Sequence, residues 1–424
     1  MAGDKSLYVA FCHPDLGLGG AERLVVDAAC ELCNHGHEVD VYTAYYDRNR
    51  CFKETLTGQF SVTVAGGWFP RAIANRAHAF CAYVRCMLIA VRIAITALRR
   101  GRAYDVIFVD QVSAAIPVLL LLTRSKVLFY CHFPDLLLAQ KRSGIRRLYR
   151  APLDAVEETT TGQAHQILVN SKYTQGIFRK TFRRLNGQGK VPEVFYPAVP
   201  IPTEEELIEA QRSWQSVLSS DTAAFMRGKR AFLSINRFER KKNLGLAVRA
   251  VKAMLTDHSS DPGVSESVLV IAGGYDKRLA ENREHYEELV DLIAELGLQS
   301  KVILIRSFTD AERSALLAAA AAVVYTPTNE HFGIVPLEAM AAGRPVLACN
   351  SGGPTESVLH GRTGFLAEPE AAAFASDMAQ LAVAKRSKHM GKLAREHVRQ
   401  TFSREAFGSR LDSIVRKLAT SKSM

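Results

Sequence analysis

The chain has 424 residues, of which 48% are hydrophobic and 23% are charged, a composition that can bury a large core and excludes disordered and fibrous proteins. At roughly 150 residues per domain, two or three domains are expected. Lysines and arginines number 54 against 43 aspartates and glutamates, and the net charge of +11 favours an anionic partner without deciding between phosphate, a membrane surface and nucleic acid.

In the first half of the chain, short apolar runs alternate with helical stretches. Strands are predicted at residues 7–12, 38–43, 106–109, 127–131 and 166–170, with a helix from about residue 20. This alternation is typical of βα units, in which helices cover both faces of a parallel sheet. The residues before the first strand contain no apolar signal region, and the eight scattered cysteines fit reduced thiols, so a cytosolic environment is expected.

The loop after the first predicted strand is rich in glycine. Gly17, Gly19 and Gly20 lead directly into the first predicted helix. Glycines there let backbone N–H groups approach an anion, and the start of the helix adds the positive end of its dipole. The pattern is neither G-x-G-x-x-G nor a P-loop, so a plain tight turn remains the alternative.

Residues 75–98 form an apolar segment that is long enough to cross a bilayer. Arg85 and Arg92 interrupt it, and an arginine near a bilayer centre costs on the order of 2.5–3.5 kcal/mol, which argues against spanning. Arg85, Arg92 and Arg99 are spaced by seven residues, which places them on one stripe of a helix. Two interpretations stay open: a helix lying in a membrane surface, or a core helix with a solvated arginine ridge. A second apolar run, residues 114–122, is short and is predicted to be a buried helix.

Prolines break the pattern at residues 196–202 and indicate a domain boundary. After a predicted helix at 204–215, strands are expected at residues 231–236, 268–272, 301–305, 322–325 and 345–348. The prediction is therefore two α/β domains, residues 1–198 and 199–403, with a C-terminal helix at about 404–424 that packs back on the first domain.

Two groups of residues follow predicted strands of the second domain. Four cations come directly after the strand that ends at Asn236: Arg237, Arg240, Lys241 and Lys242. Ligands of open parallel sheets bind beyond the carboxyl ends of strands, so these cations are placed to bind a diphosphate, with a solvated charge cluster as the alternative. Gly273 and Gly274 follow the next strand and either allow close backbone approach or form an ordinary turn.

The most specific stretch contains two carboxylates. Glu330 lies in a predicted loop and Glu338 about a turn inside a predicted helix, a spacing at which both can face one cleft. Four residues follow the first glutamate: His331, Phe332, Gly333 and Ile334.

This pattern resembles the E-x7-E signature of retaining, nucleotide-sugar-dependent glycosyltransferases of GT-B family 4. The resemblance extends, in the same order along nearly the whole chain, to Arg237 with Lys242, to the Gly273–Gly274 loop and to residues 351–364. Four segments resemble more narrowly the α-1,3/1,6-mannosyltransferases of dolichol-linked oligosaccharide assembly: residues 127–138, 146–164, 234–243 and 325–340. The resemblance implies a GT-B fold, in which two Rossmann-like α/β domains face a central cleft.

The activity that the resemblance implies is transfer of mannose, with retention, from GDP-mannose to a mannosyl-chitobiosyl-diphosphodolichol acceptor, forming α-1,3 and α-1,6 linkages. It implies a place at the cytosolic face of the endoplasmic reticulum membrane, where association with other early dolichol-pathway mannosyltransferases is a further possibility. Nucleic-acid binding is not expected, since no basic patch is interleaved with aromatic residues. Neither a metal nor another cofactor is expected to be required, because the chain has no Asp-x-Asp sequence and no second cysteine pair beside Cys30 and Cys33.

The resemblance also assigns roles in binding the donor nucleotide. Arg237 and Lys242 would hold the diphosphate and neutralise the charge of the leaving group, helped by the backbone N–H groups of Gly19 and Gly20. Glu338 would accept hydrogen bonds from the ribose hydroxyls.

Further residues are assigned to the transferred sugar. Glu330 and the backbone of residues 332–334 would hold the mannose, and His132 would form a hydrogen bond with the donor sugar near its reacting carbon unless it is merely a satisfied strand-end histidine. His331 would contact either sugar or diphosphate, and no side chain can be named as a base. The alternatives are another family 4 transferase, a sugar-nucleotide epimerase, or a non-catalytic membrane-associated scaffold.

Overall fold

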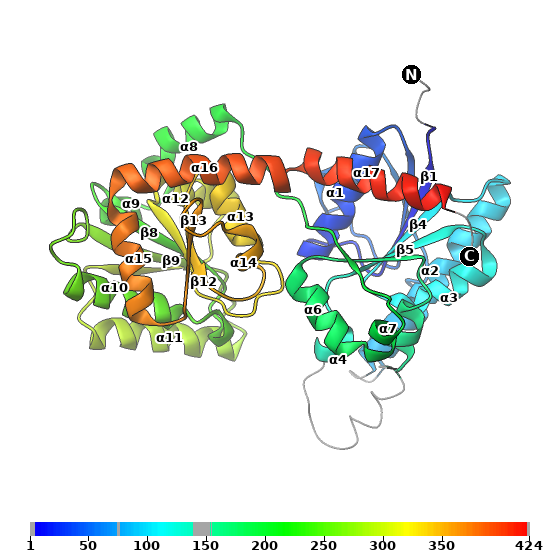
Figure 1. Cartoon of the computed structure of the whole chain (residues 1–424), viewed down its shortest axis with the longest axis horizontal. Helices are drawn as coiled ribbons and strands as arrows, with labels where there is room; N and C mark the ends of the chain where they lie inside the picture. Colours follow the sequence, from blue (N-terminus) through cyan, green and yellow to red (C-terminus); the bar gives the residue numbers. More distant parts are fainter. Residues whose placement is uncertain (1–4, 74–76, 139–152, 154, 422–424) are drawn as a thin grey trace, which may run out of the picture. The chain divides into compact units, whose positions relative to one another are not determined.

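The computed structural model describes residues 5–73, 77–138, 153 and 155–421 of the chain (Figure 1). These residues form two compact units, Met1–Ala198 with Arg404–Met424, and Val199–Ser403. Each unit is Rossmann-like, and every strand pair among the described residues is parallel. Part of the segment 146–164, which contributes to the family resemblance, lies outside the described residues.

The first unit is built on a sheet in the order β3-β2-β1-β4-β5-β6-β7. Its described strands are β1 (Tyr8–His13), β2 (Glu38–Thr43), β3 (Ser61–Val64), β4 (Val106–Asp110), β5 (Lys126–Cys131), β6 (Gln166–Val169) and β7 (Glu193–Val194). Its described helices are α1 (Gly20–Asn34), α2 (His78–Arg100), α3 (Ile116–Leu122), α4 (Asp135–Leu138), α6 (Lys172–Thr181), α7 (Arg183–Gly187) and α17 (Arg404–Thr420), with the short 3₁₀ helices η1 (Lys53–Leu56) and η2 (Ser113–Ala115). The sequence does not predict β3 and β7, which are short strands at the two edges of the sheet.

Both faces of this first sheet are covered by helices because successive strand residues point to opposite sides. Val9 and Phe11 of β1 belong to a core shared with α1 and α17, whereas Tyr8 and Ala10 belong to a core shared with α2. Figure 1 shows α17 running beside α1. The last helix of the chain thus completes the core of the first unit.

The second unit is built on a sheet in the order β10-β9-β8-β11-β12-β13. Its described strands are β8 (Arg230–Ile235), β9 (Ser267–Gly273), β10 (Val302–Arg306), β11 (Ala322–Tyr325), β12 (Val346–Cys349) and β13 (Gly364–Ala367). Its described helices are α8 (Glu204–Val217), α9 (Ser220–Met226), α10 (Leu244–Asp257), α11 (Ala280–Glu295), α12 (Asp310–Ala319), α13 (Ile334–Ala341), α14 (Pro354–Ser357), α15 (Ala371–Ala382) and α16 (Ala384–Phe402), with the 3₁₀ helix η3 (Arg240–Lys242). The sequence does not predict β13, a short edge strand.

Candidate functional site

The strand order marks where each unit can bind a ligand. It reverses between β1 and β4 in the first described sheet and between β8 and β11 in the second. Ligands of parallel sheets bind beyond the carboxyl ends of the strands at such reversals. The candidate site regions are therefore the residues after β1, β4 and β5 in the first unit and after β8, β9 and β11 in the second.

The ends of β8 and β9 approach each other so closely that a side chain is excluded. A Cβ atom on Gly273 would lie 1.7 Å from the carbonyl oxygen of Asn236, and one on Gly274 would lie 3.3 Å from Cγ of Arg237. The Arg237 side chain is 63% exposed and lies 2.9 Å from Glu239. Its guanidinium group is therefore exposed to solvent at this edge of the sheet.

Lys242 and Glu330, which are 88 residues apart, form an ion pair. Nζ of Lys242, at the end of η3, lies 2.6 Å from Oε2 of Glu330, and the hydroxyl group of Tyr325 donates to the same oxygen at 3.0 Å. Burial disfavours the charged carboxylate, but Lys242 outweighs this effect and lowers the pKa of Glu330. Burial and the same carboxylate raise the pKa of Tyr325. Lys242, assigned to the diphosphate, and Glu330, assigned to the sugar, are thus joined in one ion pair.

The glycines after β12 hold the Glu330 loop in place. The backbone N–H of Gly353 donates to the carbonyl oxygen of Glu330 at 2.8 Å. A Cβ atom on Gly353 would lie 2.1 Å from the oxygen of Phe332, and Gly352 has φ +65° with its Cβ position 2.5 Å from the oxygen of Glu330. Gly333, with φ +81°, is the N-cap residue of α13. The glycine motif therefore shapes the loop that carries Glu330.

His331 is partly buried beside Glu330. Burial lowers the pKa of its imidazole ring, and the neighbouring carboxylate opposes this effect only in part. His331 therefore lies beside the ion pair of Lys242 and Glu330, with a pKa below its ordinary value.

Glu338 has a cationic partner of its own. Its carboxylate contacts the guanidinium group of Arg313 on α12, and the two side chains are 20% and 28% exposed. Both residues line a groove of about 1490 Å³ between α8 and α12, whose described lining residues do not include Glu330. The two glutamates of the motif thus face different cations, which the sequence does not predict.

In the first unit, His132 follows β5 and is fixed by Asp110 at the end of β4. Nε2 of His132 lies 2.9 Å from Oδ1 of Asp110, and Nδ1 of His13 lies 2.8 Å from the other carboxylate oxygen. Burial disfavours ionisation of Asp110, but the two histidines lower its pKa to about 2. Asp110 in turn raises the pKa of His132 against the effect of burial.

The glycine loop leaves space for a ligand at Gly20 but not at Gly19. A Cβ atom on Gly20 would meet no heavy atom within 4 Å, whereas one on Gly19 would lie 2.3 Å from a carboxylate oxygen of Glu22. Gly19 caps α1 in an extended conformation with φ −157°. A diphosphate at this loop therefore requires the Glu22 side chain to move away from Gly19.

The prediction that Arg85, Arg92 and Arg99 form one exposed ridge on α2 is wrong for Arg85. Arg85 is buried and its Nη2 lies 2.7 Å from Oδ1 of Asp15, whereas Arg92 and Arg99 are exposed. Arg85 lies on nearly the same stripe of the helix as Arg92, because seven residues differ from two full turns by only about 20°. Arg85 is buried because the loop after β1 covers this part of α2 and places Asp15 against its guanidinium group.

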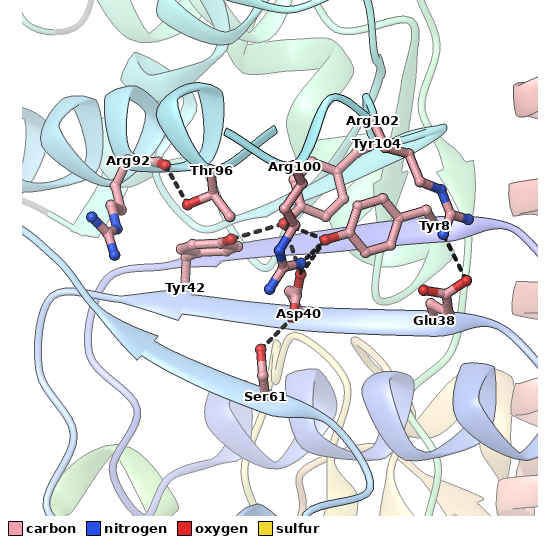
Figure 2. Close-up of polar contacts among 10 residues, drawn as sticks. All are labelled: Tyr8, Glu38, Asp40, Tyr42, Ser61, Arg92, Thr96, Arg100, Arg102 and Tyr104. Carbon is pink, nitrogen blue, oxygen red and sulfur yellow. Dashed lines mark hydrogen bonds and ion pairs between the residues drawn. The ribbon is translucent and has the colours of Figure 1, made fainter. Parts of the chain in front are cut away.

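The C-terminal end of α2 is anchored on the sheet of the first unit. Figure 2 shows Asp40 of β2 as the shared acceptor of hydrogen bonds from Tyr8 at 2.6 Å, Tyr104 at 2.8 Å and Arg100 at 2.5 Å. Ser61 donates to the second carboxylate oxygen. One face of α2 is therefore part of the core, as one of the two interpretations expects.

The opposite face of α2 is exposed and apolar. Leu98 is 82% exposed, and Val91 and Ile95 are also exposed. Among the described residues α2 is the one helix long and apolar enough to cross a membrane, a test that core helices also pass. The neighbouring α3 is not wholly buried as predicted, because Leu121 at its end is 83% exposed.

Sequence reasoning missed several partners of the predicted site residues: His13, Asp110, Arg313 and Tyr325. Asp110 is the last residue of β4, and a position at a strand end is also the signal that pointed to His132. In the described part of the chain, no three His, Cys, Asp or Glu side chains are grouped so that they could hold a metal ion.

Comparisons with known proteins cover nearly the whole chain. A family profile described as Glycosyltransferase Family 4 matches residues 18–200, and one described as Glycosyl transferases group 1 matches residues 221–397. The chain is 45% identical to the α-1,3/1,6-mannosyltransferase ALG2 of Mus musculus, covering 97% of this chain and 96% of that protein. It is 43% identical to ALG2 of Rhizomucor pusillus, covering 98% and 93%. The structure of sucrose-phosphate synthase from Thermosynechococcus elongatus has a TM-score of 0.69 at 21% identity, covering 97% of this chain and 99% of that one, which shows the shared fold.

Proposed function

This chain belongs to the α-1,3/1,6-mannosyltransferase family of GT-B glycosyltransferases, and we propose that it transfers mannose from GDP-mannose to a mannosyl-chitobiosyl-diphosphodolichol acceptor with retention of configuration. The observation that carries the proposal is the identity of 43–45% with enzymes of this name over 97–98% of the chain. The relatives described are named as mannosyltransferases, and none of the comparisons favours an epimerase or a non-catalytic scaffold.

In the proposed reaction, cations of the second unit stabilise the leaving diphosphate. Arg237 is exposed at the ends of β8 and β9, and Lys242, at the end of η3, has its ammonium group on Glu330. As the bond between sugar and phosphate breaks, negative charge grows on the phosphate oxygens, and fixed cations stabilise that charge most. These side chains take the place of a metal ion, which we propose is not required.

Carboxylates and histidines are proposed to bind the remaining parts of the donor. Glu338 accepts hydrogen bonds from the ribose hydroxyls, while Glu330 and the backbone of residues 332–334 bind the mannose. His132 binds the sugar near its reacting carbon, and His331 contacts sugar or diphosphate. The leaving phosphate oxygen accepts the proton of the acceptor hydroxyl, and no side chain is assigned as base.

The acceptor carries a long polyprenyl tail, so the enzyme is proposed to act at the cytosolic face of the endoplasmic reticulum membrane. The exposed apolar side chains of α2 and α3 form the surface proposed to contact the lipid, here called the α2–α3 patch: Val91, Ile95, Leu98, Leu121 and Leu122. The exposed cations Arg92, Arg99 and Arg124 border it and suit anionic head groups. Association with other early dolichol-pathway mannosyltransferases is part of the same proposal.

Product analysis tests this function. The full chain is incubated with GDP-mannose and a mannosyl-chitobiosyl-diphosphate lipid, and the products are digested with linkage-specific α-mannosidases. We expect two mannoses to be added, one in α-1,3 and one in α-1,6 linkage. Lys242→Met should lower the rate at saturating donor. Hydrolysis or epimerisation of the donor without transfer, or transfer only from another nucleotide sugar, overturns the proposal.

A further inference from the structure

A carboxylate that is inaccessible to solvent joins two histidines of the first unit. Asp110 is 1% exposed and accepts from His13 at 2.8 Å with one oxygen and from His132 at 2.9 Å with the other. The strand register explains this meeting, because Val109 of β4 pairs with Cys12 of β1, and Asp110 pairs with Tyr130 of β5. Each histidine follows one of these paired residues by one or two positions.

The hydrogen-bond partners determine which ring nitrogens carry hydrogens. A carboxylate only accepts, so His132 must donate through Nε2 and His13 through Nδ1. The other nitrogen of His13 lies 3.0 Å from the carbonyl oxygen of Asp15, which is also only an acceptor. Since Nε2 of His132 is engaged by Asp110, Nδ1 is the ring nitrogen left for a substrate.

The chain of contacts continues to α2. The carboxylate of Asp15 lies 2.7 Å from Arg85 and 3.3 Å from Arg71. Arg85 is buried, and replacing its charge would leave the Asp15 carboxylate without its closest cation. Arg85 thus holds the side chain of Asp15, the backbone oxygen of Asp15 contacts His13, and His13 is joined through Asp110 to His132.

We propose that Asp110 is a positioning residue for His132, fixing the ring so that Nδ1 is presented to the donor sugar, and that Arg85 and Asp15 hold this arrangement through His13. The inference rests on the proposed role of His132 in binding the donor sugar. It also gives a role to Arg85, which is buried and cannot contact a membrane: Arg85 helps to hold the residues that position His132.

The charges around His132 give this arrangement a measurable signature. Asp110 of β4 and Glu22 of α1 raise the pKa of the ring, while burial lowers it. Titratable groups that also face Asp110 include His13 on β1 and Tyr130 and Cys131 on β5, and burial, followed by nearby carboxylates such as Asp110, raises the pKa of the latter two. Loss of the Asp110 charge should therefore lower the pKa of His132.

The experiment compares the full chain with its Asp110→Asn variant. The imidazole of His132 is titrated by NMR with labelled histidine, its signal being assigned by its loss in His132→Gln. We expect the midpoint to move to lower pH by about 1–3 units, the size of the effect of an adjacent opposite charge. The pH–rate profile for mannosyl transfer is then compared between the wild type and His132→Gln, and the limb that is missing in His132→Gln is assigned to His132. In Asp110→Asn this limb should move to lower pH by the same amount.

Three further variants keep the test independent of folding. Arg85→Met removes a cation and leaves the Asp15 carboxylate without its closest partner, so it should move the His132 midpoint to higher pH by a smaller amount. Arg85→Lys should restore the midpoint, and Arg183→Met, which removes an exposed arginine of the same unit, should leave it unchanged. An unchanged His132 midpoint in Asp110→Asn overturns the inference. If Asp110→Asn does not fold, an unchanged midpoint in Arg85→Met overturns it instead. A shifted midpoint with an unchanged pH–rate profile overturns instead the proposed role of His132 in the reaction.

Discussion

The carboxylates assigned to the donor are not free in this structure, since each is paired with a buried or half-buried cation. Glu330 is held by Lys242, and Glu338 by Arg313. Removing one member of such a pair leaves the other charge without its partner, which costs more than the pair itself contributes. Substitutions at these positions therefore change both folding stability and ligand binding, and the two effects must be separated by measurement.

Glu338→Ala is expected to weaken GDP binding by about 1–3 kcal/mol, because ribose hydroxyls lose their acceptor. It is also expected to lower the free energy of unfolding, because Arg313 loses its partner. The double variant Arg313→Met/Glu338→Ala should recover stability without recovering GDP affinity. Calorimetry and urea unfolding measure the two quantities. GDP affinity equal to that of the wild type in Glu338→Ala would remove Glu338 from the ribose site.

The pH dependence of stability should report the pair of Lys242 and Glu330. The pKa of Glu330 is lowered in the folded chain, so the pair contributes stability above the unfolded pKa of about 4.3, and this contribution is lost as the pH falls through the lower folded value. Glu330→Gln should therefore make the free energy of unfolding less steep in pH below about 4.3. Urea unfolding at a series of pH values checks this. An acid slope identical to that of the wild type would contradict the expectation.

Among the elements, α2 carries different chemistry on its two faces. Ile89 and Ile93 pack in the core, and Arg100 bonds to Asp40 of the sheet, while Leu98 lies in the exposed α2–α3 patch. Apolar composition alone does not separate these faces, because both are rich in aliphatic side chains. The distinction comes from what each face packs against, so the membrane contact must be tested on the exposed residues only.

Arg92→Glu with Arg99→Glu is expected to reduce sedimentation with anionic liposomes, since each cation near such a surface contributes about 1 kcal/mol. Transfer to a full-length lipid acceptor should slow, and transfer to a short-tailed, water-soluble acceptor should persist. Arg183→Glu with Arg184→Glu makes the same charge change on α7 and serves as the control. If both double variants bind liposomes equally, Arg92 and Arg99 are not membrane contacts.

At the level of the whole molecule, the chain builds its first unit from two separate stretches. The strands of that unit precede residue 199, but its core also includes Leu411 and Val415 of α17, which follow the entire second unit. The first unit is therefore complete only when the last helix has been made. Stability of the two units should respond differently to changes in α17.

Leu411→Ala is expected to destabilise the first unit by about 2–5 kcal/mol, because it opens a cavity under α17. Amide hydrogen exchange should quicken in residues 5–73, 77–138 and 155–198 and stay unchanged in the second unit. Ser413→Ala, at an exposed position of the same helix, is the matched control. Equal acceleration of exchange in both units would show that they do not unfold separately.

Initial transfer rates are expected to be the same with and without a chelator. The reason is that Arg237 and Lys242 can offset the charge of the diphosphate without a metal ion. Rates are measured in EDTA and after return of Mg²⁺ or Mn²⁺. Complete loss of activity in EDTA that one divalent ion restores would overturn the expectation.

Local sequence pattern was enough to predict the parallel sheets and the candidate residues of the second unit. The periodicity of apolar residues distinguishes strands from helices along the chain. The cations after β8 and the glutamates around α13 lie within short sequence motifs, so they can be recognised without knowledge of the fold. The strands that escaped prediction, β3, β7 and β13, are short edge strands, whose few residues give little periodic signal.

The partners of those residues depended on which strands and helices become neighbours. His13 and Asp110 are 97 residues apart, and Arg313 and Glu338 are 25 residues apart. No local pattern links such pairs, because they meet only when the order and register of the strands and the packing of the helices are established. Arg85 shows the same limit, since its spacing matches Arg92 and Arg99 while the loop after β1 buries it against Asp15. Sequence specifies the charge of each side chain, and the neighbouring elements decide whether that charge meets solvent or a buried partner.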